Sequence, residues 1–149
     1  MTQEEHYDVA SYALGVLDQH DAARFEDHLI ECPRCAFELE SFVQVADALA
    51  DVDAEALLAA EKSEQDGVLL NKMLHEVRTD RVLQSMTVSD ALRELSQSHR
   101  EILIETYFRG RTVPEAAEKL NLPLGTAKSR VYYALRALRT ALQQRGVTE

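Results

Sequence analysis

Residues 112–142 read TVPEAAEKLNLPLGTAKSRVYYALRALRTAL, and this stretch decides the fold. Thr112 followed by Glu115 three residues later is a capping-box pattern, which predicts the start of a short helix. The Gly- and Pro-containing residues 121–125 predict a tight turn, and Thr126 is the expected cap of a last, longer helix. Because two helices joined by so short a turn cross at a wide angle, the stretch predicts a helix-turn-helix unit.

The last helix has one apolar side and one polar side when its residues are projected at 100° per residue. The polar side is basic, hydroxylated and aromatic, with Lys128 and Tyr132 on its flanks, and it begins at the amino end of the helix. A recognition helix needs this arrangement because its first turns enter the major groove of DNA. The alternative is a helical hairpin whose basic side chains are only solvated. The candidate DNA contacts on and near this face are Arg111, Lys119, Thr126, Lys128, Ser129, Arg130, Tyr133 and Arg136.

The rest of the chain also predicts helices. Ala, Leu, Glu and Arg dominate, Gly and Pro number only 5 and 3, and runs of β-branched residues with period two are missing. We therefore expect an all-α protein, with a break in one helix near Thr87 and Gly110 as a helix stop. The expected helices cover 7–17, 22–31, 33–50, 53–62, 68–95 and 97–109.

The net charge of −10 is unevenly distributed along the chain. Residues 1–66 hold 17 acidic and 3 basic residues and carry −14, whereas residues 67–149 hold 9 acidic and 13 basic residues and carry +4. This division predicts two domains that have different partners or bind each other; the alternative is two ordinary solvated surfaces. We find no apolar run long enough to span a bilayer and no leader peptide, so we expect a cytoplasmic chain.

The first domain contains a candidate metal site. Residues 28–35 read HLIECPRC, so His28 and Cys32 lie one helical turn apart and Cys35 follows one turn later. Three such ligands at a helix junction suit tetrahedral zinc. His6 is the expected fourth ligand because the first helix can fold back over the next two, and His20 is the alternative. Two other interpretations are a buried thiol pair beside a core histidine and a dithiol redox pair.

The C-terminal half resembles region 4 of bacterial sigma factors of the extracytoplasmic-function group. The resemblance rests on LRELSQSHREIL at 92–103, YFRG at 107–110, TVPEAAEKL at 112–120 and GTAKSRV at 125–131. It covers residues 79–149 and implies a four-helix, helix-turn-helix domain. Its implied partners are the promoter −35 element and the RNA polymerase core.

This half departs from the usual pattern of the family at three positions. Ser96 stands where proline is usual, Pro114 lies inside the first turn of a helix, and Ala117 replaces a larger apolar residue. None of these departures removes the DNA face. The residues that match DNA-contacting positions of the family are Lys128, Ser129, Arg130 and Tyr133.

The N-terminal half resembles the zinc-associated anti-sigma domain. His6, the ALGVL of 13–17, the FEDHL of 25–29 and the CPRC of 32–35 carry the resemblance, which covers about residues 1–62. It implies a small zinc-binding helical bundle with a further helix, which binds a sigma factor and keeps it from RNA polymerase. Some members of that family lose zinc and release the sigma factor on oxidation.

Together, the two resemblances predict a transcription regulator in which an anti-sigma domain inhibits a sigma region 4 within one chain. The expected division is 1–62 for the zinc domain, 63–78 for a linker and leading helix, and 79–149 for the DNA-binding domain. Such a chain is an anti-sigma/sigma fusion, natural or engineered, and the expected anti-sigma/sigma contact is intramolecular or intermolecular. The alternative is a one-component metal- or redox-sensing repressor, which would bind palindromic DNA as a dimer. We expect no enzyme, because catalytic motifs are missing and four protein ligands leave zinc no open position.

Overall fold

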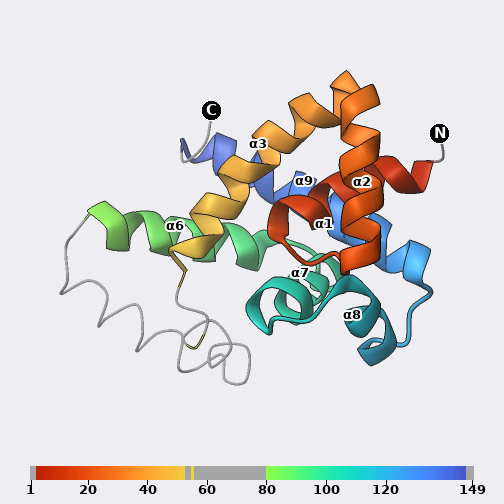
Figure 1. The fold of residues 1–149 in the computed structure, drawn as a ribbon. Coiled ribbons are helices and arrows are strands. Elements are labelled where there is room, and N and C mark those ends of the chain that lie inside the picture. The colour runs from red at the N-terminus through yellow and green to blue at the C-terminus, as the bar shows by residue number, and fades with distance from the viewer. Residues whose placement is uncertain (1–2, 53–54, 56–79, 147–149) are drawn as a thin grey trace.

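The computed structural model describes residues 3–52, 55 and 80–146, and Figure 1 shows their arrangement. These residues form helices and connecting turns without any strand, which confirms the predicted all-α class. The predicted helix over 53–62 and the predicted linker lie outside the described residues, apart from residue 55. The elements are α1 (Gln3–Leu14), α2 (Gln19–Glu31), α3 (Pro33–Ala50), α6 (Asp80–Glu94), α7 (Gln97–Leu103), the π-helix η1 (Ile104–Phe108), α8 (Val113–Lys119) and α9 (Leu124–Gln144).

The first three helices end and begin where the local chemistry requires. Gly15 follows α1 with a φ of +73°, a left-handed conformation that glycine adopts without steric cost. Asp18 then caps α2 by accepting a hydrogen bond from the Asp21 amide at 2.8 Å. Pro33 occupies the first turn of α3, where its missing N–H costs nothing. These signals place α1, α2 and α3 in succession with short connections.

The apolar stripe that the sequence predicts for the buried face of α3 differs from the buried face in the structure. That stripe consists of Leu39, Phe42, Val43, Ala46, Leu49 and Ala50. Phe42 and Leu49 are buried as expected, but Val43 is 41% exposed and Val45 is buried instead. The difference arises because α3 packs against both α1 and α9, so its buried face is set by two neighbours rather than one.

The helix-turn-helix unit forms as its caps predict. The side chain of Thr112 accepts a hydrogen bond from the Glu115 amide at 3.4 Å, and the Glu115 carboxylate accepts one from the Thr112 amide at 3.0 Å. This is a complete capping box at the start of α8. Gly110 has a φ of +72° and ends the preceding helical segment, as predicted.

Several predicted helix limits are wrong. The first helix covers Gln3–Leu14 rather than 7–17, and α2 begins at Gln19 rather than at 22. Helix α6 continues through Thr87 without a break, and Val88, Ala91 and Leu92, which follow that position, are buried. Helix α9 begins at Leu124 after Pro123, so Thr126 lies inside its first turn and does not cap it. Pro123 has the extended backbone conformation of the residue before a helix, and its ring fixes φ. Because Pro123 occupies the cap position, Thr126 does not cap the helix.

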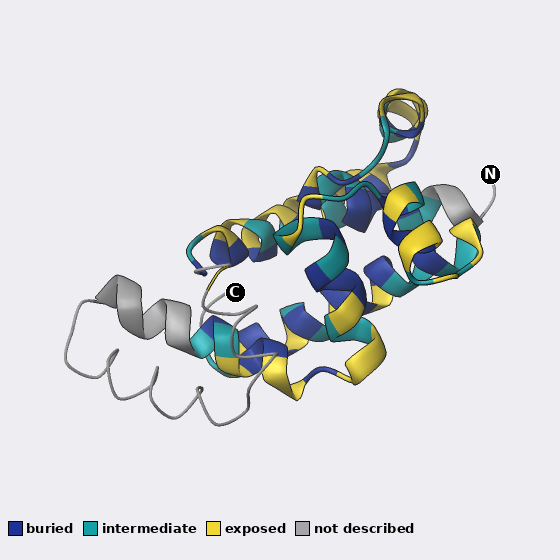
Figure 2. Ribbon diagram, turned by 90° about the horizontal axis from the view of Figure 1, so that it is seen from below, coloured by how far each residue is buried: buried dark blue, intermediate teal, exposed yellow. Residues whose placement is uncertain are grey.

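The two halves share one buried core in the described part of the chain. Helices α1 and α3 pack against α9, as seen in Figure 1, and Figure 2 shows buried residues on the sides of the helices that face one another. The Val113 amide also donates a 2.8 Å hydrogen bond to the carbonyl oxygen of Val16, which links the turn after α1 to the start of α8. The acidic half is therefore docked on the basic half.

Candidate metal centre and nucleic-acid interface

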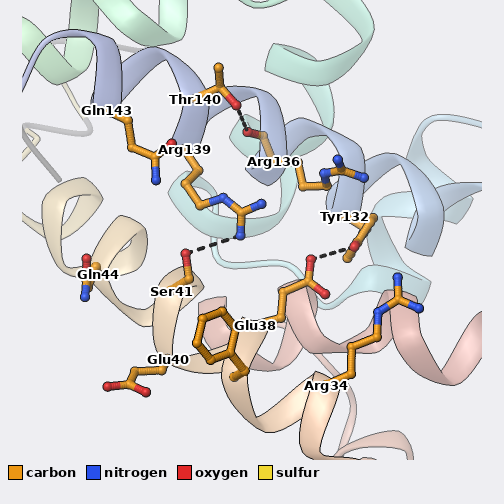
Figure 3. A pocket seen from close by; sticks show the side chains of 11 residues that line it. Arg34, Glu38, Glu40, Ser41, Gln44, Tyr132, Arg136, Arg139, Thr140 and Gln143 are labelled. Atoms are coloured by element: carbon orange, nitrogen blue, oxygen red, sulfur yellow. Dashed lines mark hydrogen bonds between the residues drawn. The ribbon is translucent and has the colours of Figure 1, made fainter. Parts of the chain in front are cut away.

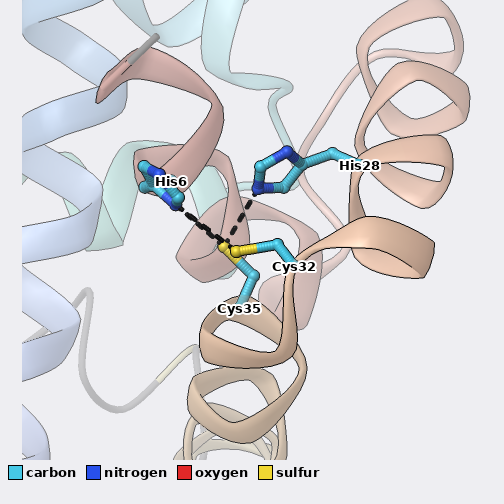
Figure 4. A group of neighbouring side chains, drawn as sticks. All are labelled: His6, His28, Cys32 and Cys35. Carbon is cyan, nitrogen blue, oxygen red and sulfur yellow. Dashed lines mark hydrogen bonds between the residues drawn. The ribbon is translucent and has the colours of Figure 1, made fainter. Parts of the chain in front are cut away.

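Four potential metal ligands meet where α1 approaches the junction of α2 and α3. His6 comes from α1, His28 from the last turn of α2, Cys32 from the junction and Cys35 from the first turn of α3. Figure 4 shows the two imidazole rings directed toward the two sulfur atoms. The ligand atoms all lie within 4.8 Å of one another, and only His6 is not fully buried.

The distances between these atoms are close to those around a tetrahedral zinc ion. His6 Nδ1 lies 3.2 Å from Cys35 Sγ and 4.0 Å from Cys32 Sγ, and His28 Nε2 lies 3.3 Å from Cys35 Sγ. In a tetrahedron with zinc bond lengths typical of sulfur and nitrogen, ligand atoms are about 3.3–3.8 Å apart. Two thiolates and two imidazoles would fill all four positions, as in a structural zinc site.

The protonation state of Cys35 depends on a bound cation. Burial raises the pKa of the Cys35 thiol to about 12, and the neighbouring Cys32 thiol raises it further in the same direction. Without a cation this thiol is therefore protonated at neutral pH. Only the thiolate ligates zinc, so metal binding must displace a proton from this residue.

The alternative fourth ligand, His20, does not join this cluster. It lies in the first turn of α2 and its side chain is exposed. His6 approaches instead because α1 folds back across α2 and α3, as the sequence interpretation assumed.

On α9, the helix that the sequence predicts to contact DNA, the structure places Lys128 differently from the sequence interpretation. The side chain was expected at the flank of an outward-facing surface, but it is only 4% exposed. Its Nζ lies 3.1 Å from Asp21 Oδ2 and 3.5 Å from Asp8 Oδ1. Both carboxylates belong to the acidic half, and both are buried. Lys128 thus forms an ion pair with each of two helices of the opposite half.

Burial also changes the titration of one of these carboxylates. Burial raises the pKa of Asp8 to about 6, and the ammonium group of Lys128 opposes that rise. Asp8 is consequently ionised at neutral pH, and its charge is compensated by Lys128. A lysine buried without such partners would be strongly destabilising.

Aromatic and polar contacts extend this interface along α9. The Tyr132 hydroxyl donates a 2.5 Å hydrogen bond to Glu38 Oε1, and the Tyr132 ring packs against Phe42 with centroids 5.8 Å apart. Arg139 donates a 3.2 Å hydrogen bond to Ser41 Oγ. Tyr132 was also expected at the flank of an outward face, and α3 buries it.

The remaining candidate DNA contacts stay accessible to different degrees. Lys119, Tyr133 and Arg136 are exposed, while Thr126, Ser129 and Arg130 are half-buried. Arg111 is half-buried and its guanidinium contacts the Glu105 carboxylate at 2.5 Å. Of the eight candidate DNA contacts, Lys128 is therefore the one that is buried.

Sequence reasoning missed the residues on the acidic half that contact α9. Asp8, Asp21, Glu38 and Ser41 were not identified individually. The available signal was the charge division between the halves, which predicted contact without specifying the partners. These four residues lie on different turns of α1, α2 and α3, so no single sequence motif contains them. They can be identified only from the way the two halves dock.

Comparisons with known proteins confirm both resemblances. Residues 91–140 match the family model of sigma-70, region 4, and residues 7–36 match the model of a zinc-finger family. The zinc-finger match ends just after Cys35, so it contains three of the four clustered ligands. Zinc is thus the metal that both the donor set and the family match indicate.

Curated relatives match a part of the chain. An ECF RNA polymerase sigma factor, SigL, from Mycobacterium tuberculosis strains H37Rv and CDC 1551, is 44% identical over 66 residues, which are 44% of this chain. The matched part covers 37% of that relative, so the chain spans well under half the length of SigL. No solved structure matches the chain. Among the described helices, none combines the length and apolarity that crossing a membrane requires.

Proposed function

We propose that this chain is a transcription regulator in which a sigma region 4-like domain is held inactive by a zinc-containing anti-sigma-like domain. The proposed DNA target is the promoter −35 element, and the proposed protein partner is the RNA polymerase core. These proposed partners support a cytoplasmic location. The role requires no catalysis, and zinc would act as a structural ion.

The observation that carries the proposal is the burial of Lys128. This lysine lies in the first turns of α9, where a recognition helix meets DNA. A phosphate or base edge can be contacted by its ammonium group only if Asp8 and Asp21 withdraw. Because the same side chain cannot be buried in the acidic half and inserted into a groove of DNA, docking and DNA binding exclude each other.

Charge and connectivity support the same conclusion. The acidic half carries −14, so its presence beside α9 repels the DNA backbone in addition to covering one contact. Both halves belong to one chain, and a short connection gives a local concentration of about millimolar. The docked arrangement is therefore favoured even when each individual contact is weak.

The zinc cluster would stabilise the docked surface. His6, Tyr7 and Asp8 are consecutive on α1: His6 faces the metal ligands, the Tyr7 ring lies 5.3 Å from that of Tyr132, and Asp8 pairs with Lys128. Fixing His6 therefore also fixes the part of α1 that contacts α9. This is the role proposed for the metal in this chain.

The test is DNA binding by the full chain with and without the two carboxylates. The double variant Asp8→Asn, Asp21→Asn keeps the side-chain volumes but removes the charges that hold Lys128. Duplexes that bind the variant are first selected from a random-sequence pool. Fluorescence anisotropy then compares the variant with the wild type on the selected DNA. We expect the variant to bind at least about tenfold more tightly, as expected if release of Lys128 supplies more than about 1.4 kcal/mol.

A matched control is Asp90→Asn, which removes one exposed acidic charge from α6. It changes the net charge without touching α9's contacts with α1 and α2. Equal DNA affinity for the wild type, the control and the double variant would contradict the proposal. The selected sequences also separate the two candidate functions, since a single asymmetric element fits sigma region 4, whereas a palindrome fits a dimeric repressor.

A further inference from the structure

A groove of about 720 Å³ lies between α3 and α9, where the acidic half meets the basic half. Figure 3 shows its two walls, with Arg34, Glu38 and Gln44 on α3 and Tyr132, Arg139 and Gln143 on α9. Its size falls within the range of roughly 300–1,000 Å³ that is typical of small-molecule sites. Pockets of this kind occur preferentially at domain interfaces.

The groove is lined by three guanidinium groups, although its α3 wall belongs to the strongly acidic half. Arg34 comes from α3, and Arg136 and Arg139 come from α9. The lining also holds two carboxylates: Glu38 accepts a 2.5 Å hydrogen bond from the Tyr132 hydroxyl, and Glu40 is exposed. Guanidinium groups recognise phosphate through paired N–H donors, so this arrangement favours a phosphate-bearing ligand.

Two of these arginines are held in place by aromatic rings. The guanidinium carbon of Arg139 lies 4.8 Å from the centre of the Phe42 ring, and that of Arg136 lies 5.9 Å from the centre of the Tyr132 ring. Stacking of this kind orients the planar group and leaves N–H donors at its edge. One N–H group of Arg139 donates a 3.2 Å hydrogen bond to Ser41 Oγ. The α9 wall therefore presents oriented cationic groups rather than loosely solvated side chains.

An exposed aromatic ring completes the site. Phe37 lines the groove and is 79% exposed, which is unusual for so large an apolar side chain. It lies one helical turn after Arg34. A planar base can stack on such a ring, while phosphates attached to it would reach the guanidinium groups. Stacking on an aromatic side chain contributes about 1–3 kcal/mol per base in nucleic-acid complexes.

We propose that the groove binds a nucleoside polyphosphate, with its phosphates on Arg34, Arg136 and Arg139 and its base on Phe37. One wall belongs to each half, so the complete site exists only in the docked chain. The inference thus rests on the proposed intramolecular pairing. By linkage, a ligand that binds only the docked state favours that state, and it would deepen the inhibition of DNA binding.

Calorimetric titration of the full, zinc-loaded chain with ATP tests the site directly. We expect one ATP per chain. Inorganic tripolyphosphate, which lacks the base, should bind more weakly, and adenosine, which lacks the phosphates, more weakly still. Arg34→Gln should weaken ATP binding by about tenfold or more, since it removes one charge-assisted contact. Phe37→Ala should weaken binding of ATP but leave binding of tripolyphosphate unchanged.

The matched control is Arg93→Gln, which removes a partly exposed arginine from α6, outside the groove lining. Absence of saturable ATP binding by the folded chain would overturn the inference. ATP binding that survives both Arg34→Gln and Arg136→Gln would overturn it as well, because the ligand would then lie elsewhere. Tripolyphosphate binding as tightly as ATP would exclude a base on Phe37 and overturn the nucleotide assignment.

Failure of this inference can be distinguished from failure of the proposed function. If Asp8→Asn, Asp21→Asn releases DNA binding while ATP does not bind, the pairing stands and the nucleotide site is wrong. If ATP binds the wild type and requires Arg34 while that double variant gains no DNA affinity, the site stands and the inhibitory role is wrong. Added ATP should lower DNA binding by the wild type but should not lower DNA binding by the Arg34→Gln variant. Arg34 suits this test because it lies outside the candidate DNA face.

Discussion

His6 and Asp8 lie two residues apart on α1 and contact opposite halves of the molecule. His6 Nδ1 lies 3.2 Å from Cys35 Sγ in the metal cluster, whereas Asp8 Oδ1 lies 3.5 Å from the Lys128 ammonium on α9. Because less than one helical turn separates them, a displacement of either residue moves the other. We therefore expect the state of the metal cluster and the exposure of α9 to be coupled through α1.

Removal of zinc should increase DNA binding. Without the metal, His6 loses one of its contacts, and α1 keeps its packing and the ion pair of Asp8 with Lys128. We expect chelation, or His6→Ala, to raise affinity for the selected DNA by about tenfold, with the helical content retained. Fluorescence anisotropy measures the affinity, and far-ultraviolet circular dichroism checks the helices.

His20→Ala is the matched control for His6→Ala, because His20 is exposed and lies outside the cluster. It should retain one zinc per chain and leave DNA affinity unchanged. Loss of zinc in His20→Ala together with its retention in His6→Ala would show that the fourth ligand has been misassigned.

Much of the fold could be predicted from the sequence because its signals are local. The caps of α2, α7 and α8 depend on Asp18, Ser96 and Thr112, each of which bonds an amide three residues later. The stop at Gly110 depends on one residue with a positive φ. The start of α9 was misplaced because Thr126 offers a capping side chain, while Pro123 fixes the helix start through its backbone.

The metal cluster was predictable for a similar reason, since spacing along a helix brings His28, Cys32 and Cys35 together. The partners of Lys128 were not predictable, because burial of a lysine requires two carboxylates from α1 and α2 to converge on α9. No local pattern marks such a convergence. A projection of α9 alone treats every polar side chain as solvent-facing, and therefore placed Lys128 and Tyr132 on the outside.

Zinc binding should release protons, and its affinity should rise with pH. Burial raises the pKa of Cys35 to about 12, so this thiol is protonated in the metal-free chain throughout the neutral range. Coordination displaces that proton, so each proton released makes the apparent affinity rise about tenfold per pH unit. Calorimetry in buffers of different ionisation enthalpy between pH 6.5 and 8 should give at least one proton per zinc. A pH-independent affinity would mean that Cys35 is not a ligand.

Tyr132→Phe should destabilise the chain by about 1 kcal/mol, the usual effect of losing one hydrogen bond. Burial raises the pKa of Tyr132 to about 12, and its hydrogen bond to Glu38 adds to the rise, so the hydroxyl is protonated and donates at neutral pH. The variant leaves the half-buried Glu38 carboxylate without this donor. Urea unfolding, monitored by circular dichroism, measures the decrease in the free energy of unfolding. Tyr133→Phe is the control, because the side chain of Tyr133 is 42% exposed and its hydroxyl forms an exposed 3.3 Å hydrogen bond with the Tyr7 hydroxyl. Equal destabilisation by the two variants would argue against the Glu38 contact.

Thr112→Ala should lower the free energy of unfolding by about 1 kcal/mol, whereas Thr126→Ala should change it by less than about 0.5 kcal/mol. Thr112 accepts the Glu115 amide and completes the capping box, so its loss leaves an amide at the start of α8 unpaired. Thr126 resembles a cap in sequence but lies within the first turn of α9, after the helix has already begun at Leu124. The two substitutions are chemically identical and differ only in this position. Urea unfolding of both variants therefore tests the assigned start of α9. If Thr126→Ala lowers the free energy of unfolding by more than about 0.5 kcal/mol, Thr126 acts as a cap and the helix begins at residue 127.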